Sequence, residues 1–222
     1  MRANRPSVDA RRPLRSGCAA AFPDPLPHEP ALLLRRWLDD AEEAVAEDFN
    51  AMVLATASAA GAPSARVVLC KQIEPAPPAV VFYTNYESRK GRELEANPRA
   101  AGVFYWPALK RQARVEGAVV RTTEAESDEY FRSRPLLSRL GAIASRQSQP
   151  LPSRTALAVR VARAALTPGA AARRPPSWGG FRMLLDRIEL WAAGAGRLHD
   201  RVLWIRVPSS DPTRWTSTRL FP

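Results

Sequence analysis

Lysine is scarce in this chain of 222 residues, of which 33 are Lys or Arg. It occurs only at positions 71, 90 and 110, and arginine supplies the rest of the positive charge. Two of these lysines, Lys71 and Lys90, fall within one short stretch, residues 66–91. Because the chain otherwise uses arginine, we interpret that stretch as functional.

Cysteine and histidine are rarer still, with two of each. Cys18 and Cys70 give no disulfide framework, and without a cysteine pair or a histidine cluster a structural zinc site is excluded. We interpret Cys70, in the middle of an apolar strand, as a small core residue. His28 lies among prolines, and we expect it to have no role.

Long apolar runs are absent as well, since no segment approaches the ~20 residues that a membrane-spanning helix needs. The pair Arg11-Arg12, followed by a short apolar stretch, superficially looks like an export signal. That stretch is too short and is interrupted by Pro23. We therefore expect no export, no membrane partner and a cytoplasmic location.

The net charge of +11 and the sequence pI near 10.8 would normally indicate a nucleic-acid partner. The arginines are instead scattered among acidic residues, without a basic run or a nucleic-acid-binding motif, so we expect no such partner. Residues 1–29 are rich in Pro, Arg and Ala and lack periodicity, which predicts a flexible basic arm. Residues 30–222 are expected to form one domain.

Apolar spacing predicts strands with a few peripheral helices. After Pro30, leucines and Trp37 recur at helical spacing, which predicts an amphipathic helix that covers a sheet. Short antiparallel strands with such helices indicate an α+β, mainly β fold centred on a β-barrel. Further helices are expected at 89–97, 124–134, 136–144 and 154–166, and strands at 51–57, 66–71, 80–83, 100–106, 111–122, 180–184, 187–191, 201–207 and 214–220.

The stretch 66–91 gives the sharpest local signal. Ser88 is a good N-cap for a helix that begins at Arg89. Cations are normally disfavoured in the first turn of a helix, yet Arg89 and Lys90 both lie there. Free backbone N–H groups with two cations would bind a phosphate, whereas the simpler interpretation is a solvated basic helix end.

Arg66 and Lys71 extend this candidate site along a strand. Residues five apart in a regular strand lie on opposite faces, about 16 Å apart along its length. One small anion could not contact both. A long ligand lying along the strand could, with its phosphate at Arg66 and its reactive end near Lys71, and flavin mononucleotide (FMN) has that shape.

A second cluster is Arg197-Leu198-His199-Asp200-Arg201. In an extended conformation Arg197, His199 and Arg201 share one face, which favours an anionic or electron-rich ligand over a solvated strand end. Tyr130 and Arg134 share a helix face in the same way, with Ser138 just beyond, although that pattern alone is more typical of a surface.

The order of motifs along roughly residues 30–222 is more specific than any one of them. The motifs are Arg66-x-Val68-Leu69-x-Lys71, Phe82-Tyr83-Thr84-Asn85-x-x-Ser88-Arg89-Lys90-Gly91, Asn97-Pro98, Phe104-Tyr105-Trp106, Arg111-Gln112-x-Arg114-Val115-Glu116-Gly117, Ser133-Arg134-Pro135-x-x-Ser138-x-x-Gly141-Ala142, Gln147-Ser148, Trp178-Gly179-Gly180, Trp191 and Arg197-Leu198-His199-Asp200-Arg201. Together they resemble the pyridoxine (pyridoxamine) 5'-phosphate oxidase family.

The resemblance implies a split β-barrel that binds FMN at a homodimer interface. The substrate phosphate would be bound by Lys71, Tyr130, Arg134 and Ser138. The implied catalytic residues, Arg197 and His199, would face the pyridine ring of the substrate. The implied FMN contacts are Arg66, Val67, Val68, Leu69, Lys71, Tyr83, Thr84, Arg89, Lys90, Gln112, Gln147, Ser148, Trp191 and Arg201.

The chain departs from the family in two places. An Arg-Arg-x-Tyr segment usually precedes the first helix, and here the residues are Arg11-Arg12-Pro13-Leu14. The usual Phe-Trp-Gln-Gly is here Leu190-Trp191-Ala192-Ala193. Both lie on the substrate side, so they bear on the substrate more than on FMN.

The implied function is FMN-dependent oxidation of pyridoxine 5'-phosphate or pyridoxamine 5'-phosphate to pyridoxal 5'-phosphate, with O2 as acceptor and H2O2 as product. One alternative is an FMN-dependent oxidase of another ring, of the phenazine-biosynthesis type, whose members generally lack the substrate-phosphate lysine retained here as Lys71. Another is a flavin- or pyridoxal-phosphate-binding protein without turnover, which only the altered N-terminal pattern favours.

Overall fold

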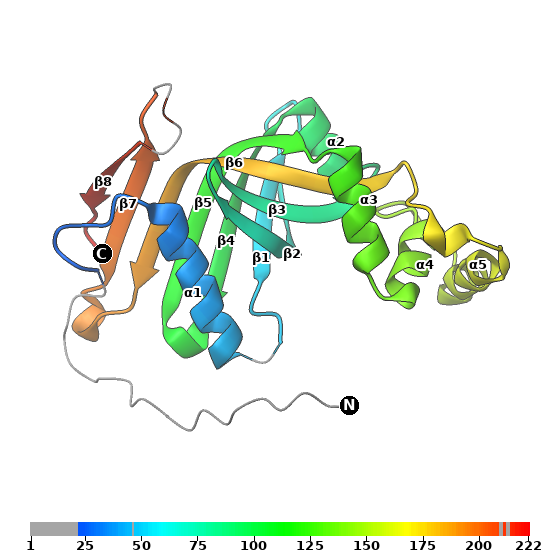
Figure 1. Cartoon of the computed structure of the whole chain (residues 1–222), viewed down its shortest axis with the longest axis horizontal. Helices are drawn as coiled ribbons and strands as arrows, with labels where there is room; N and C mark the ends of the chain where they lie inside the picture. The colour runs from blue at the N-terminus through cyan, green and yellow to red at the C-terminus, as the bar shows by residue number, and fades with distance from the viewer. Residues whose placement is uncertain (1–21, 46, 209–210, 212–213) are drawn as a thin grey trace.

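Six antiparallel strands close into a barrel in this computed structural model, which describes residues 22–45, 47–208, 211 and 214–222 (Figure 1). Strand β3 pairs with β2 on one side and with β6 on the other, which closes the barrel, while β7 and β8 continue the sheet beyond β6. The predicted α+β, mainly β class with a split barrel is confirmed. The strands are β1 (Ala51–Ala57), β2 (Pro63–Pro75), β3 (Pro78–Asn85), β4 (Arg99–Trp106), β5 (Arg111–Arg121), β6 (Trp178–Ala192), β7 (Asp200–Arg206) and β8 (Trp215–Arg219).

The barrel interior is apolar because alternate residues of each strand point inward. Ala113, Val115 and Val119 of β5 are buried, as the alternation in its sequence predicted. They pack with Phe82, Phe104 and other large side chains of the neighbouring strands. Burial of each such side chain stabilises the fold by about 1.5–3 kcal/mol, so this cluster holds the barrel closed.

Strand β6 corrects one sequence expectation. Two strands were predicted, at 180–184 and 187–191, but the structure has one continuous strand. Leu185 and Asp186 form no turn, because β5 pairs with β6 on both sides of Asp186, which is an extra residue of β6 opposite Glu116 and Gly117. A Cβ atom at Gly117 would lie 1.8 Å from the carbonyl oxygen of Leu184, so only glycine allows this approach.

The helices cover the barrel and one of its ends. Leu34, Trp37 and Ala41 of the first helix are buried against the barrel core. The last three helices gather at the end of the molecule opposite β7 and β8 (Figure 1). The helices are α1 (Pro30–Ala44), α2 (Arg89–Ala96), α3 (Glu124–Ser133), α4 (Leu136–Ala144) and α5 (Arg154–Leu166).

Ion pairs tie α3 to the barrel. Arg182 of β6 donates to Glu74 of β2 at 2.7 and 2.9 Å and to Glu126 of α3 at 2.6 Å. Arg174, just before β6, donates to Asp128 of α3 at 2.6 Å and also pairs with Glu124. The position of α3 is therefore set by β6.

The segment before α1 contains a second correction. Residues 1–21 of the predicted arm, with Cys18 and Arg11-Arg12, lie outside the described residues. Phe22 is only 2% exposed, and its ring stacks on Trp37 with centroids 5.6 Å apart and meets Trp204 edge-on at 6.1 Å. Phe22 is thus a core residue, which the proline-rich sequence around it concealed.

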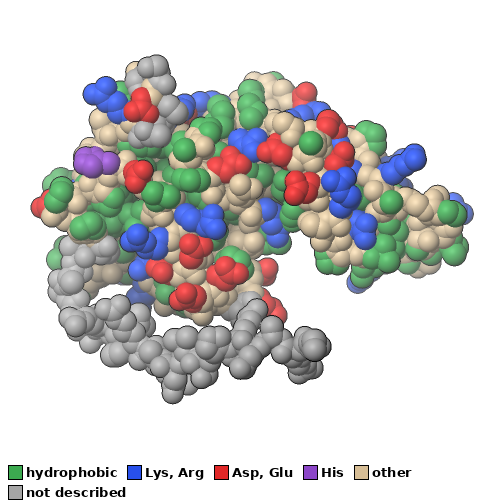
Figure 2. Space-filling view, in the orientation of Figure 1, with side chains coloured by type: hydrophobic (Ala, Val, Ile, Leu, Met, Phe, Trp, Pro, Cys, Tyr) green, Lys and Arg blue, Asp and Glu red, His purple; other side chains and the backbone are tan. Residues whose placement is uncertain are grey.

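Acidic and basic side chains intermingle over the barrel and α3 on the face shown in Figure 2. Many form ion pairs, such as Arg99 with Asp186 and Arg121 with Glu95, each at 2.7 Å. This is the scattered distribution of arginine that the sequence indicated. No helix in the described ranges is long and apolar enough to cross a membrane.

We predict that Phe22→Ala lowers the free energy of unfolding by about 3 kcal/mol, because it leaves a cavity between Trp37 and Trp204. Denaturant unfolding measures the loss. The control is Leu166→Ala, whose side chain is 82% exposed, with an expected change below about 0.5 kcal/mol. An effect of Phe22→Ala as small as that of the control would assign residue 22 to the arm.

Candidate functional site

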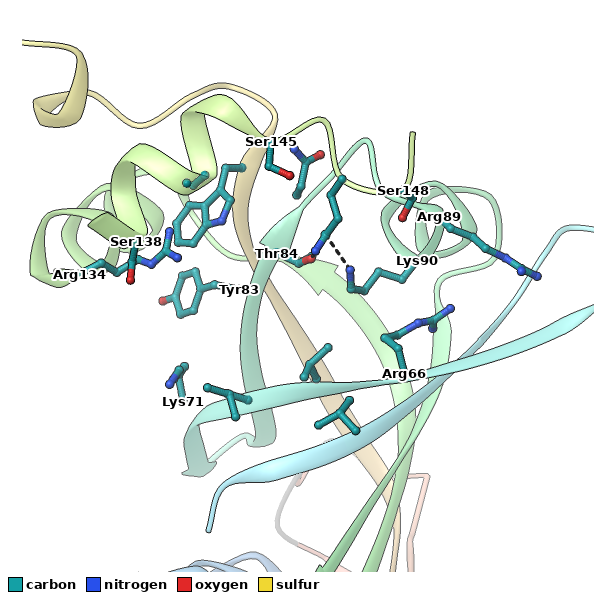
Figure 3. Close-up of a pocket in the computed structure, with 18 of the residues that line it drawn as sticks. Arg66, Lys71, Tyr83, Thr84, Arg89, Lys90, Arg134, Ser138, Ser145 and Ser148 are labelled. Atoms are coloured by element: carbon teal, nitrogen blue, oxygen red, sulfur yellow. Dashed lines mark hydrogen bonds between the residues drawn. The ribbon is translucent and has the colours of Figure 1, made fainter. Parts of the chain in front are cut away.

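One large cavity of about 930 Å³ lies between β2, β3, the N-terminus of α2 and the α3–α4 segment (Figure 3). It brings together most of the site residues that the sequence predicted. These are Arg66, Val67, Val68, Leu69, Lys71, Tyr83, Thr84, Arg89, Lys90, Tyr130, Arg134, Ser138, Gln147 and Ser148.

The α2 end of the cavity is strongly cationic. Arg66, Arg89 and Lys90 lie at this end in Figure 3. Ser88 caps α2 as predicted, since its Oγ accepts a hydrogen bond from Gly91 N at 3.3 Å. Three cations and the free backbone N–H groups at the N-terminus of a helix are the kinds of group that bind a phosphate.

Lys90 is held in place before any ligand arrives. Its Nζ donates to Ser88 Oγ at 3.2 Å and to Gln147 Oε1 at 2.9 Å. The same Gln147 oxygen accepts from Thr84 Oγ1 at 3.2 Å. Burial lowers the pKa of Lys90 to about 8, and the nearby Arg66 acts in the same direction, because both disfavour the ammonium.

The opposite end of the cavity has a second set of donors. Lys71, Arg134 and Ser138 lie there in Figure 3, and Tyr130 also lines this end. Within the described part of the chain, Nη1 of Arg134 is buried and has no hydrogen-bond partner. Burial lowers the pKa of Lys71 and of Arg134, so both cations lack solvation that an anion would replace.

Lys71 reaches the cavity through a β-bulge that the sequence did not reveal. The sequence placed Arg66 and Lys71 on opposite faces of a regular strand, but both line the same cavity. The pairing of β2 with β3 shifts register between Cys70 and Gln72. Lys71 is the extra residue of this bulge, where the regular alternation of the strand is interrupted.

Trp178 is a site residue that sequence reasoning missed. Its ring is nearly parallel to Tyr83, 5.7 Å away, and to Tyr130, 6.2 Å away, and the guanidinium of Arg134 lies 4.6 Å above it. Trp178 thus supports Arg134 by a cation–π contact. The only sequence signal was the Trp178-Gly179-Gly180 motif, to which no role had been given.

Five predicted site residues do not line this cavity: Gln112, Trp191, Arg197, His199 and Arg201. They gather at the other end of β6, where Trp191 pairs with Gln112 and Arg201 in the sheet and its ring lies 4.6 Å from that of His199. Trp178 and Trp191 stand at opposite ends of β6, a contour of up to roughly 43 Å at ~3.3 Å per residue. Within one chain the predicted site residues therefore form two separate groups.

The segment 197–201 is not extended throughout, which corrects the expected shared face. Arg197 has φ of 64° and ends a short 3₁₀ turn. His199 Nδ1 accepts a hydrogen bond from Gly194 N at 3.3 Å, so in the neutral ring the proton is on Nε2. Arg201 lies in β7 and donates to Glu189 Oε1 at 3.0 and 2.8 Å. The turn, not strand alternation, orients Arg197 and His199.

Comparison with known families decides the class of this protein. Residues 38–167 match the family model described as pyridoxamine 5'-phosphate oxidase. The chain belongs to that family. Residues 178–222 match the model of the pyridoxine 5'-phosphate oxidase C-terminal dimerisation region. The resemblance seen in the sequence and the predicted enzyme class, an FMN-dependent oxidase of this family, are confirmed.

Curated relatives share about half of their residues with this chain. The pyridoxine/pyridoxamine 5'-phosphate oxidase of Ruegeria sp. is 50% identical over 194 residues, which cover 87% of this chain and 94% of the relative. The protein of the same name from Paracoccus denitrificans is 52% identical over 180 residues, 80% of this chain and 82% of the relative.

Two solved structures have the same fold. PhzG from Burkholderia lata 383, in complex with tetrahydrophenazine-1-carboxylic acid, superposes with a TM-score of 0.80 at 35% identity, covering 90% of this chain and 95% of that one. A pyridoxamine 5'-phosphate oxidase-related, FMN-binding protein from Nostoc punctiforme gives 0.68 at 16% identity, with coverage of 86% and 95%, and supports the fold alone.

We predict that affinity for FMN falls as the pH rises above about 8. A bound phosphate favours the charged form of Lys90, so binding is unimpaired below the pKa of the free pocket and weakens above it, by up to about tenfold per pH unit. The phosphate itself stays doubly ionised there, since its second pKa is about 6. Flavin titrations from pH 7 to about 9.5 measure this. The Lys90→Gln variant should bind FMN weakly, and its affinity should not change with pH over this range. If affinity in that variant still fell with pH as it does in the unaltered protein, Lys90 would not be the group responsible.

Proposed function

We propose that this protein is an FMN-dependent oxidase that converts pyridoxine 5'-phosphate or pyridoxamine 5'-phosphate to pyridoxal 5'-phosphate. The observation that supports this most is the pair of cationic groups at the two ends of one cavity. Arg66, Arg89 and Lys90 are suited to the phosphate of FMN, and Lys71 and Arg134 to the phosphate of the substrate. FMN and the substrate, bound in line with one phosphate each, would account for both cationic groups.

The residues present suit FMN. The strand β2 offers an apolar wall, Val67 to Leu69, along which a flat ring system can lie, while the phosphate reaches the N-terminus of α2. When bound, FMN would accept a hydride equivalent from the substrate carbon that bears the hydroxyl or the amine and pass the electrons to O2, giving H2O2. The protein then needs to hold that carbon against the flavin and keep both phosphates in place.

The substrate end is preorganised by stacking. Arg134 lies over Trp178, and Tyr130 stacks on Tyr83 with centroids 3.9 Å apart. A phosphate bound here would give the buried Nη1 of Arg134 the partner that it lacks. Since an unpaired buried donor is costly, phosphate binding at this end is favoured.

A homodimer would complete the site. The C-terminal region matches a dimerisation region, and the cluster of Trp191, Arg197, His199 and Arg201 lies away from its own chain's cavity. We infer that each cavity receives this cluster from the second copy. Arg197 and His199 would orient the pyridine ring, with His199 donating through Nε2, while Gln112, Trp191 and Arg201 would contact FMN.

A second candidate is oxidation of another ring, which the similarity to PhzG favours. The cationic group at the substrate end would then bind a carboxylate in place of a phosphate. The retained Lys71, beside Arg134, favours the more highly charged phosphate. Activity on phosphorylated and carboxylated rings distinguishes the two.

The direct test is the absorbance spectrum of the purified protein, followed by peroxide formation with each phosphorylated vitamer. We expect a flavin spectrum and substrate-dependent H2O2. If FMN is bound but none of the phosphorylated B6 compounds gives peroxide, two alternatives would remain: an oxidase of another ring substrate, or a binding protein without turnover.

We predict that Arg134→Ala raises KM for pyridoxine 5'-phosphate by about ten- to a hundredfold with a smaller effect on kcat, because a phosphate far from the reacting carbon is bound similarly in ground and transition states. Arg132→Ala is the matched control, since Arg132 is exposed in the last turn of α3, two residues before the C-cap Arg134, and lies outside the cavity. Equal KM values in the two variants would remove Arg134 from the phosphate site.

Truncation of Arg197 and truncation of Arg201 should impair the enzyme in different ways. Arg197→Ala is expected to lower kcat/KM at least tenfold with FMN still bound, because lost transition-state contacts appear in that ratio. Arg201→Ala should first lower flavin occupancy. Loss of FMN from Arg197→Ala, with normal turnover in excess flavin, would reverse the proposed orientation of substrate and cofactor.

A further inference from the structure

Glu93 lies behind the cationic end of the cavity and does not line it. It sits on the second turn of α2 and is only 7% exposed. A buried carboxylate is stable as an anion only when its oxygens accept several hydrogen bonds. Its partners therefore indicate what it does.

Both oxygens of Glu93 are occupied by donors from three elements. Oε2 accepts from Thr56 Oγ1 of β1 at 2.5 Å and from Ser64 Oγ of β2 at 2.6 Å. Oε1 accepts from Nε of Arg89 at 2.8 Å, while Nη2 of Arg66 lies 3.4 Å from Oε2. Burial alone would raise the pKa of Glu93, but the hydrogen bonds outweigh burial and lower the pKa to about 2.

The same network fixes Arg66. Nη1 of Arg66 donates to Thr56 Oγ1 at 2.6 Å and to the carbonyl oxygen of Leu54 at 3.2 Å, and Nη2 donates to Ser64 Oγ. Thr56 faces Ser64 across the β1–β2 pair, so the two hydroxyls link the guanidinium to the carboxylate. Arg66 and Arg89 thus share one buried anchor.

We propose that Glu93 is a positioning residue for the phosphate of the flavin. It orients Arg66 and Arg89 from behind, and Arg89, which uses Nε on Glu93, keeps Nη1 and Nη2 free of hydrogen bonds within the described structure. The negative charge of Glu93 reduces the net charge of the three cations at this end to two positive charges. That charge nearly balances the charge of about −1.5 to −2 on a phosphomonoester. The inference rests on the proposed FMN site.

Positioning and simple charge make opposite predictions. If Glu93 acted only as a negative charge near the phosphate, its removal would strengthen phosphate binding. If it positions the arginines, its removal frees two side chains, and their conformational freedom must then be lost each time a phosphate binds, which weakens binding. The sign of the change in affinity therefore decides between them.

The experiment compares FMN with riboflavin, which lacks the phosphate, by fluorescence titration of the flavin-free protein. In Glu93→Gln we expect affinity for FMN to fall by about ten- to a hundredfold, while affinity for riboflavin changes less than about twofold. Glu93→Asp keeps the charge but withdraws the carboxylate by one methylene, so it should show the same selective loss. Glu95→Gln is the matched control, because Glu95 is on the same helix and pairs with Arg121 outside the cavity.

The outcomes separate the inference from the function on which it rests. Equal affinity of the unaltered protein for FMN and riboflavin would remove the phosphate site itself. Preference for FMN that persists or increases in Glu93→Gln would overturn the role of Glu93 alone. If Glu93→Gln loses both flavins through misfolding, Glu93→Asp decides: an unchanged FMN-to-riboflavin ratio in a folded Glu93→Asp protein overturns the proposal, and a reduced ratio supports it.

Discussion

Strand β6 imposes the constraint on which both the barrel and the site depend. It pairs along its length with β5, with β3 over its first half and with β7 over its second half. Closure of the barrel requires the pairings of β6 with β3 and with β5 to be in register. The bulge at Asp186, opposite Glu116 and Gly117, allows β5 to follow β6 without a break. Because β6 is continuous, its two ends cannot approach each other.

That geometry divides the functional residues. Trp178, at the start of β6, belongs to the cavity with Lys71 and Arg134, whereas Trp191, at its end, belongs to the cluster with His199. Within one chain the predicted site residues thus form two incomplete sets. Residues 178–222 match a dimerisation region, and in the proposed dimer a second copy would bring the missing set to each cavity.

Buried carboxylates recur as the supports of arginine in this arginine-rich chain. Glu93 holds Arg66 and Arg89, and Glu189, also 7% exposed, holds Arg114 and Arg201. Such pairs add little net stability, because desolvation of the charges offsets their attraction, but loss of the arginines would leave a buried carboxylate without its charge partners. Their effect is to fix where a guanidinium points, and that matters most around an anionic ligand.

Local chemistry in the sequence predicted much of this structure. Strand β1 and helices α4 and α5 have the expected bounds, and Ser88 caps α2, because each depends on residues only a few positions apart. What could not be predicted depends on pairing between distant segments. The bulge at Lys71 exists only against β3, the continuity of β6 only against β5, and the burial of Phe22 only against Trp37 and Trp204.

The two lysines of the stretch 66–91 illustrate the same limit. Their scarcity drew attention to the stretch, but the reason for lysine at position 90 is visible only in three dimensions. Nζ of Lys90 fits between Ser88 and Gln147, beside Arg66, in a space that suits a compact ammonium rather than a planar guanidinium. A lysine can also shift its pKa when buried, whereas arginine stays charged at every ordinary pH. Above about pH 8 the cationic end of the cavity would therefore lose the charge of Lys90 while empty and regain it when a phosphate binds, so that part of the binding energy of the phosphate would be coupled to a single proton.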